Sequence, residues 1–283
     1  MIDFSTSTKV VPDSGRLTLG RRLLDVHTWL VYVFLYAPIV ILVIFSFTKD
    51  GFGVRWTGFT LKWYQRLFDD ERMMAAALNT LWVALLATII STILGTLLAL
   101  AMERYRFRGR AGLDALLYLP IVIPEIVMAL ALLAFFSFSF GIVEALFGVQ
   151  LRMNIWTVIC SHVAFCVSFV VVVVRASLKG FDVRLEEAAA DLGADPTTTF
   201  WRITLPLIMP GVIGGALLAF TLSLDDFIIS FFTIGPGTNL LPIEVYGRVK
   251  RAITPQINAI STLMLLLSMI LVFLSQFVQR RRV

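Results

Sequence analysis

The segment EEAAADLGADPTTTFWRITLPLIMPG, residues 186–211, is a polar and acidic stretch between two strongly apolar runs. Its surroundings are unusual: 58% of the 283 residues are hydrophobic and only 15% are charged, with a mean hydropathy of +0.87. Soluble domains typically carry about 25% charged residues. The quoted segment is therefore interpreted as an aqueous loop in a chain that otherwise lies in a membrane.

Six apolar runs are long enough to cross a bilayer core as helices, which takes about 20 residues. We place them at about 29–47, 79–102, 114–138, 155–174, 208–232 and 257–278. None alternates polar and apolar residues as the strands of a membrane barrel do. The sequence therefore predicts an all-α, polytopic membrane protein with six transmembrane helices. Residues 1–28 form an N-terminal cytoplasmic segment in this reading, and residues 29–283 form one transmembrane domain.

The placement of Lys and Arg predicts the orientation, because cytoplasmic loops carry the excess of these residues. With six spans, both termini lie on one side, and that side holds fifteen of the 24 basic residues. Both termini and the quoted segment are therefore expected in the cytoplasm. The net charge of +5 is explained by this topology, so no nucleic-acid partner is needed.

The quoted segment carries the local signals of two short helices. The first is predicted by an apolar stripe at helical spacing, made of Leu185, Ala188, Ala189 and Leu192. Gly193 is expected to end it in a left-handed conformation. Asp195 as N-cap and Pro196 at the first helical position then start the second helix, which runs to Leu205–Pro206. The result is a helix-turn-helix knob that faces the cytoplasm.

The pattern E-A-A-x3-G-x9-I-x-L-P in this segment resembles the EAA loop of bacterial ABC importer permeases. It lies in the loop at about 180–207, before the penultimate span, and its positions are filled by Glu187, Ala188, Ala189, Gly193, Ile203, Leu205 and Pro206. Similarity extends to LYAPIVILVIFSF, WTGFTLKWY, RYRFRG and FTLSLDDFIISFF. These stretches look like the spermidine/putrescine branch of that family, and in particular like the second of its two permeases.

This resemblance implies a type I ABC importer permease fold in a bacterial inner membrane. It also implies cytoplasmic ATPase subunits, a second and related permease, and a periplasmic solute-binding protein as partners, with membrane lipid around the spans. The knob would seat in the ATPase, with Glu187 as a polar contact and Gly193 as the turn. The turn-rich segment 235–247 is a candidate contact for the binding protein. ATP would bind the partner ATPase. This chain is expected to have no cofactor and no catalytic residue, and it contains no G-x-x-x-x-G-K-[ST] loop.

Three carboxylates lie inside or at the edge of the predicted spans, namely Glu125, Asp225 and Asp226. An acidic residue at the centre of a bilayer costs about 2.5–3.5 kcal/mol on insertion scales and usually faces a cavity or a partner. Glu125 is expected near the middle of the third span, after Pro120 and Pro124, which would break or kink that helix. We interpret the three acids as candidates for a path taken by a polyamine. Alternatively, the Asp pair caps a helix break or pairs with the partner permease.

Aromatic side chains could add cation–π contacts to such a path, and the candidates are Phe135, Phe136, Phe227 and Phe231. No metal site is expected. The cysteines Cys160 and Cys166 point to different sides of the fourth span and are expected to be buried, while His27 and His162 are far apart and expected to be satisfied locally. A small-residue face suited to helix packing, within the chain or between permeases, is formed by Gly211 and Gly215.

Other functions stay open from the sequence alone. Within ABC importers, the EAA loop is also compatible with an opine, a phosphonate or a metal ion as cargo. An ATPase-independent channel or secondary transporter would leave the knob without a purpose. A membrane scaffold or sensor would bind the ATPase and move no solute.

Overall fold

Every regular element in the computed structural model is a helix, within the residues that it describes (14–51, 55–252 and 254–280). In chain order the helices are α1 (Ser14–Phe45), α2 (Lys62–Phe68), α3 (Glu71–Arg104), α4 (Arg110–Val122), α5 (Glu125–Phe147), α6 (Ile155–Leu178), α7 (Arg184–Asp191), α8 (Pro196–Thr199), the π-helical η1 (Phe200–Thr204), α9 (Leu205–Asp225), α10 (Ile228–Thr233), α11 (Leu241–Val249) and α12 (Pro255–Arg280). The all-α prediction is confirmed.

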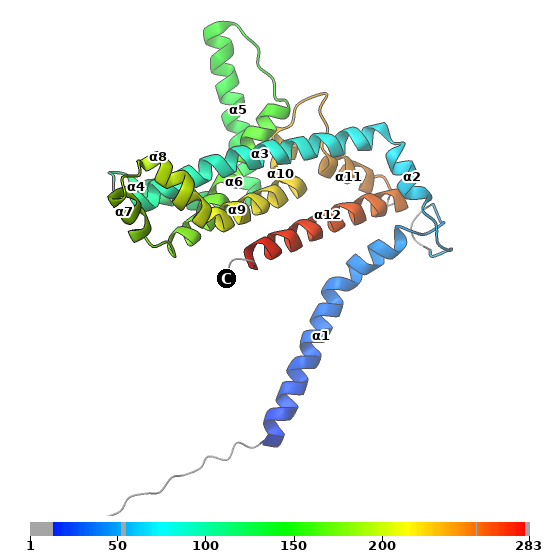
Figure 1. Cartoon of the computed structure of the whole chain (residues 1–283). Helices are drawn as coiled ribbons and strands as arrows, with labels where there is room; N and C mark the ends of the chain where they lie inside the picture. The colour runs from blue at the N-terminus through cyan, green and yellow to red at the C-terminus, as the bar shows by residue number, and fades with distance from the viewer. Residues whose placement is uncertain (1–13, 52–54, 253, 281–283) are drawn as a thin grey trace, which may run out of the picture.

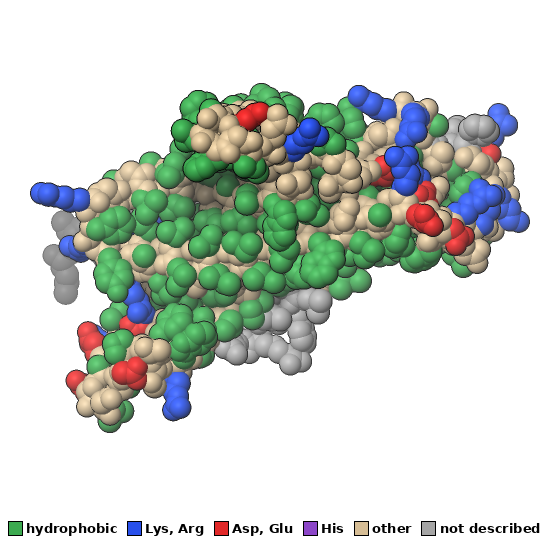
Figure 2. All heavy atoms as spheres, turned by 90° about the horizontal axis from the view of Figure 1, so that it is seen from above, with side chains coloured by type: hydrophobic (Ala, Val, Ile, Leu, Met, Phe, Trp, Pro, Cys, Tyr) green, Lys and Arg blue, Asp and Glu red, His purple; other side chains and the backbone are tan. Residues whose placement is uncertain are grey.

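Six of these helical segments are long and apolar enough to cross a membrane. They are Gly20–Phe45, Glu71–Arg104, Glu125–Phe147, Ile155–Leu178, Pro196–Asp225 and Pro255–Phe273. Figure 2 shows hydrophobic side chains over the middle of one face, with many of the charged side chains gathered toward the ends. This distribution suits a protein whose middle lies in hydrocarbon and whose ends reach water.

The centre of the molecule is a bundle of α3, α6 and α9, with α12 packed beside α9 (Figure 1). Most of its core side chains are small or β-branched, among them Ala99, Val170, Val174 and Ala219, which are fully buried. Small residues at helix interfaces let backbones approach closely in a membrane, where van der Waals packing drives association.

Glycines make the closest of these approaches. A Cβ atom on Gly95 of α3 would lie 2.7 Å from the Cβ of Val170 on α6, and one on Gly215 of α9 would lie 3.3 Å from a methyl group of the same valine. A Cβ on Gly211 would collide with Ser177 of α6. The small-residue face of Gly211 and Gly215 therefore packs within this chain.

The predicted third span, 114–138, is wrong as a single helix. The helix breaks at Ile123 and Pro124, which both have extended backbone conformations, and the spanning segment there is Glu125–Phe147. A proline disfavours the helical conformation in the residue before it, which explains why the break falls at Ile123. Pro120, by contrast, stays inside α4. Glu125 thus begins a helix instead of lying in the middle of one.

The predicted fifth span, 208–232, also differs from the structure. α9 ends at Asp225, Asp226 is extended with ψ of 119°, and α10 is a separate short helix. At its other end, the span continues without a break through η1 and α8 to Pro196, so the second helix of the knob does not stop at Leu205–Pro206. Pro206 has no N–H to donate, and the wider π-helical turn before it accommodates the proline ring.

Two helices extend away from the bundle (Figure 1). The apolar stretch of α1 has none of its residues buried, and α1 packs mainly against α12. α5 projects on another side and is held chiefly by α10. Both helices expose large apolar side chains, for example Phe34 at 80% and Phe138 at 72%. Lipid or another membrane subunit is the expected neighbour of such surfaces.

Candidate functional site

The segment that resembles an EAA loop folds as a helix, a turn and a second helix at one end of the bundle (Figure 1). The turn is left-handed at Gly193, with φ of +86°. The N–H of Gly193 donates to the carbonyl of Ala190 at 2.9 Å, and the N–H of Ala194 donates to the carbonyl of Ala189 at 3.0 Å. This Schellman motif ends α7 as the sequence predicts.

Asp195 is the N-cap of the second helix, again as predicted. Its carboxylate accepts hydrogen bonds from the N–H groups of Thr197 at 3.2 Å and Thr198 at 3.3 Å, and from the Thr198 hydroxyl at 2.5 Å. These contacts, those of Thr198 foremost, lower the pKa of Asp195 below its ordinary value of 3.8. Because α8 continues into α9, this capped turn is attached directly to a membrane span.

The seven residues of the EAA pattern divide into two groups by exposure. Those that face outward are Glu187, Ala188, Gly193 and Pro206. Those that are buried or half-buried are Ala189, Ile203 and Leu205. Leu205 packs against the core of α3, α6 and α9. The pattern therefore combines an outer surface with the apolar contacts that hold it on the bundle.

The predicted apolar stripe of α7 remains largely uncovered. Leu192 is 89% exposed and Leu185 is 45% exposed, whereas Ala189 is 7% exposed. Open apolar side chains beside an acidic, small-residue helix form a surface suited to another protein.

Glu186, which the sequence did not single out, anchors this loop. Its carboxylate accepts hydrogen bonds from the Arg104 guanidinium at the end of α3 and from the Thr204 hydroxyl in η1. Arg104 belongs to a basic stretch whose sequence predicted only the orientation of the chain in the membrane, with no contact to Glu186. Neighbouring Glu187 points outward, so adjacent acids have different tasks.

A second arginine supports the bundle next to this loop. Arg175 of α6 donates to Glu103 of α3 at 2.7 Å and to Asp114 of α4 at 2.5 Å. Arg175 lies 72 and 61 positions from these two acids in the sequence, so the pairing has no local signal. Through Arg104 and Arg175, α3 is joined to α4, α6 and the loop.

Asp226, which is buried, and Glu125, which is half-buried, meet where α9 ends and α10 begins. Asp226 is 6% exposed, and its carboxylate interacts directly with Glu125 at the start of α5 and with His162 of α6 at 3.1 Å. It also accepts the N–H groups of Ile229 at 3.3 Å and Ser230 at 2.8 Å. The alternative that this acid caps a helix break is therefore confirmed.

The two neighbouring aspartates have opposite surroundings, as the helical geometry predicts. Asp225 is exposed and makes no ion pair within the described ranges, while Asp226 is enclosed. The structure brings Glu125 and Asp226 together and leaves Asp225 on the surface beside them.

The predicted aromatic wall is divided between two places. Phe227 and Phe231 lie near the acids, with ring centroids 5.5 Å apart and the rings tilted by 39°, and the ring centroid of Tyr246 in α11 lies 4.6 Å from that of Phe227. Phe135 instead lines an apolar cavity of about 620 Å³ between α4, α5 and α6, together with Cys160. Phe136 packs against Phe135, with ring centroids 5.5 Å apart, and also against Phe140.

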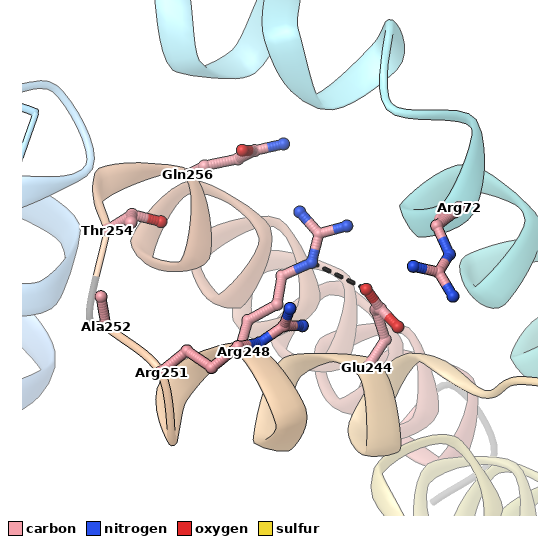
Figure 3. A pocket seen from close by; sticks show the side chains of 7 residues that line it. All are labelled: Arg72, Glu244, Arg248, Arg251, Ala252, Thr254 and Gln256. Atoms are coloured by element: carbon pink, nitrogen blue, oxygen red, sulfur yellow. Dashed lines mark hydrogen bonds and ion pairs between the residues drawn. The ribbon is translucent and has the colours of Figure 1, made fainter.

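At the end of the bundle opposite the loop, arginines surround a cavity of about 320 Å³ (Figure 3). Arg248 of α11 donates to Glu244 at 2.8 Å and, outside this view, to Asp70 at 2.6 Å. Arg72 and Arg251 lie at the same cavity and make no ion pair with a described residue. Within the segment 235–247, residues 236 and 237 form a turn with a left-handed Gly237, as predicted, whereas the part from Leu241 onward is the helix α11 and carries part of this wall.

These ion pairs change the titration of the acids. The hydrogen bond from Arg248 lowers the pKa of Asp70 below its ordinary value of 3.8. Burial raises the pKa of Glu244, but the hydrogen bonds from Arg248 and Asn239 outweigh it, and the net shift is downward. Both carboxylates are therefore ionised at neutral pH and keep Arg248 in place.

Cysteine and histidine side chains were not expected to bind metal. Cys166 is buried as predicted, but Cys160 is exposed, and both are free thiols. His162 is satisfied locally, as predicted, although the sequence did not reveal its acidic neighbour. Among the described residues, no group of three or more His, Cys, Asp or Glu side chains is arranged to hold a metal ion.

The sequence of this chain is similar to the sequences of known transport system membrane proteins. Residues 91–283 match the family described as "Binding-protein-dependent transport system inner membrane component". The chain is 42% identical to the spermidine/putrescine transport system permease protein PotC of Escherichia coli (strain K12), over 93% of this chain and 96% of that protein. It is 41% identical to the putrescine transport system permease protein PotI of the same strain, over 83% and 82%. The sulfate transport system permease protein CysT of Salmonella typhimurium is 33% identical, over 77% and 80%.

Solved structures share the fold at lower identity. A crystal structure of a bacterial ABC transporter involved in the import of the acidic polysaccharide alginate matches with a TM-score of 0.75 at 20% identity, over 95% of this chain and 97% of that chain. A crystal structure of a bacterial alginate ABC transporter in complex with alginate pentasaccharide-bound periplasmic protein matches with a TM-score of 0.70 at 20% identity, over 94% of this chain and 93% of that chain.

Proposed function

Because the chain belongs to the family of binding-protein-dependent transport system inner membrane components, we propose that it is the permease subunit of an ATP-driven importer whose cargo is a polyamine. The chain is a multi-pass inner-membrane transport subunit, and ATP hydrolysis belongs to a separate ATPase chain. Beyond this, we propose that the cargo is a polyamine, that the chain binds specific partner subunits, and that both termini lie in the cytoplasm.

One observation carries the mechanism: a single helical segment runs from the exposed loop to the buried acids. The thirty residues from Pro196 to Asp225 form this segment, and at about 1.5 Å per residue it spans about 45 Å. The loop is fastened to α3 by Arg104 and Glu186. Movement of a partner ATPase against Glu187, Ala188 and Gly193 would therefore be transmitted as a rigid-body motion to the acids.

The acids favour a cationic cargo. Glu125 and Asp226 lie together, with Asp225 exposed beside them, and buried carboxylates in a membrane are costly unless they meet a partner or a cation. Phe227 and Phe231 add aromatic faces for an ammonium group. A sulfate path, the task named for one relative, would be opposed by these negative charges. The relatives named for spermidine and putrescine are also the more similar ones.

The partners follow from the two ends of the molecule. The loop end, with its uncovered Leu192, would receive the ATPase in the cytoplasm, where both termini would also lie. The arginine cavity at the other end would receive an acidic side chain of a periplasmic solute-binding protein, because Arg72 and Arg251 are not paired with a described acid. A second permease would cover part of the exposed surface of α1 and α5.

Uptake in cells tests this function. Labelled putrescine and spermidine are supplied to cells that contain the partner subunits, with and without this chain, against unlabelled polyamines, sulfate and sugars as competitors. Loss of uptake on deletion, with competition only by polyamines, is the expected result. Unchanged uptake, or competition by sulfate or sugars, would remove the polyamine assignment.

A charge-neutralising variant tests the path itself. Glu125→Gln is expected to slow polyamine uptake while the ATPase still copurifies with the permease. Glu144→Gln is the matched control, because Glu144 lies near the far end of α5 and is exposed. Equal uptake kinetics for both variants would contradict a role for Glu125 in the path.

A further inference from the structure

His162 of α6 is a buried titratable group with no part in the mechanism described so far. Its side chain is 2% exposed. Nδ1 lies 2.6 Å from the hydroxyl of Ser223 in α9, and Nε2 lies 3.0 Å from the hydroxyl of Ser230 in α10 and 3.1 Å from the carboxylate of Asp226. One imidazole ring thus contacts both helices that flank the break at Asp226.

The neighbours decide which nitrogen carries the proton. An ionised carboxylate only accepts hydrogen bonds, so Nε2–H must donate toward Asp226. The hydroxyl of Ser223 can rotate, and it donates to Nδ1 when that nitrogen is bare or accepts from it when the ring is charged. His162 is therefore a donor to Asp226 in either charge state of the ring.

Asp226 in turn contacts two further helices, α10 and α5. It accepts the backbone N–H groups of Ile229 and Ser230, which fixes the start of α10, and it touches Glu125 at the start of α5. A buried carboxylate without donors is strongly unfavourable, so the position of the acid depends on these partners.

We propose that His162 is a positioning residue for the cation path: it holds the carboxylate of Asp226, and through it the start of α10 and the facing carboxyl group of Glu125. This inference rests on the proposed function, because it concerns the path assigned there. Under this proposal the three acids have different roles. Asp226, which is saturated by protein donors, is the anchor, and Glu125 and the exposed Asp225 are the acids that meet the cargo.

The test compares two substitutions of His162 in the complete transporter, reconstituted with its partner subunits. His162→Leu removes the donor at similar size, and His162→Gln keeps an amide N–H that can reach the position of Nε2. Hydrogen bonds to charged groups are strong enough that losing one is expected to raise the KM for putrescine about tenfold. His162→Leu should show this rise with a much smaller change in the maximal rate, and His162→Gln should recover most of the wild-type KM.

Two controls separate positioning from folding. Ser161→Ala removes a neighbouring buried hydroxyl whose one hydrogen bond to a described residue is to the carbonyl of Thr157 in α6, and it should leave the KM unchanged. In an Asp226→Asn background, His162→Leu should add less than a twofold further change, because its target is already altered.

Several results would overturn the inference. A KM within twofold of wild type in His162→Leu would do so, and so would an equal loss of assembled transporter in both His162 variants, since that outcome assigns a folding role alone. If the wild-type transporter shows no saturable polyamine uptake, the proposed function fails and this inference falls with it. Saturable wild-type uptake with an unaffected His162→Leu variant rejects only the role of His162.

Discussion

Adjacent carboxylates in this chain have opposite surroundings. Glu186 is tied to the bundle while Glu187 faces outward, and Asp226 is enclosed while Asp225 is exposed. Successive residues on a helix diverge by about 100°, so a shift of one position decides whether an acid supports the fold or faces another molecule. A motif that names only one member of a pair misses the other.

The first pair gives a direct comparison. Glu186→Ala is expected to lower the thermal midpoint of the purified permease, because Arg104 and Thr204 lose their acceptor. A half-exposed ion pair of this kind contributes about 1 kcal/mol. Glu187→Ala is expected to leave the midpoint unchanged and to weaken capture of the ATPase subunits. Thermal unfolding and copurification measure the two effects separately.

Asp191→Ala is the control for charge, because Asp191 is exposed on the same helix. An equal loss of ATPase capture in Asp191→Ala and Glu187→Ala would argue against a specific contact by Glu187. A lowered midpoint in Glu187→Ala would contradict its placement on the outer surface.

Among the helices, α3 and α9 both pack closely on Val170 of α6. Gly95→Val is expected to force these helices apart, since even its Cβ would lie 2.7 Å from the Cβ of Val170. Overpacking of this kind costs about 1–3 kcal/mol. The thermal midpoint of the permease in detergent or nanodiscs measures the loss.

Gly141→Val supplies the matched substitution in α5, where a Cβ would have no atom within 4 Å. Both changes carry the same intrinsic penalty for a β-branched residue in a helix. Equal destabilisation by the two would mean that close packing at Gly95 does not matter.

Asp70 joins three helices at the end opposite the loop. It caps α3 through the N–H of Met73 and accepts from Arg248 of α11 and Gln256 of α12. Its folded-state pKa is lowered below its ordinary value of 3.8, so its stabilisation is fully present well above that value and is lost as the pH falls through the folded-state pKa. Asp70→Asn is expected to lower the thermal midpoint at neutral pH, and the difference from wild type should shrink as the pH falls below 3.8.

The neighbouring Asp69→Asn is the control, since that side chain is exposed. A difference between Asp70→Asn and wild type that stays constant from neutral to acidic pH would show that the ionised carboxylate is not its source.

For the whole molecule, the uncovered loop and the arginine cavity lie at opposite ends of the bundle (Figure 1). In a background with Cys160→Ser and Cys166→Ala, Leu192→Cys is expected to react with a membrane-impermeant maleimide in inside-out vesicles. Phe68→Cys, at the end of α2, is expected to react in cells with a permeable outer membrane. Both side chains are well exposed, at 89% and 66%. The reversed pattern of labelling would contradict cytoplasmic termini.

The architecture follows largely from the lengths of apolar runs, because a bilayer accepts few backbone arrangements. The breaks are harder to predict. Pro120 and Pro124 gave the same local signal, and only Pro124 ends a helix, because tertiary packing decides which break is tolerated. The break after Asp225 has no proline at all, and it depends on buried groups that can satisfy the freed backbone.

The site was predictable where its signals are local. Gly193 and Asp195 each act through neighbours within a few residues, and their turn and cap agree with the sequence. His162 was missed as a partner of Asp226 because 64 positions separate them and neither carries a marker of the other. Contacts of this kind require the fold before they can be recognised.

The loose attachment of α1 has a consequence for how the protein is made. The first span packs mainly against α12, the last span to leave the ribosome. While the four intervening spans are inserted, α1 therefore lies in the lipid without its main packing partner. Nascent chains that stop before α12 would leave this helix open to chaperones, to membrane proteases and to other membrane proteins, so quality control of unfinished chains can act on the first helix long after it has entered the bilayer.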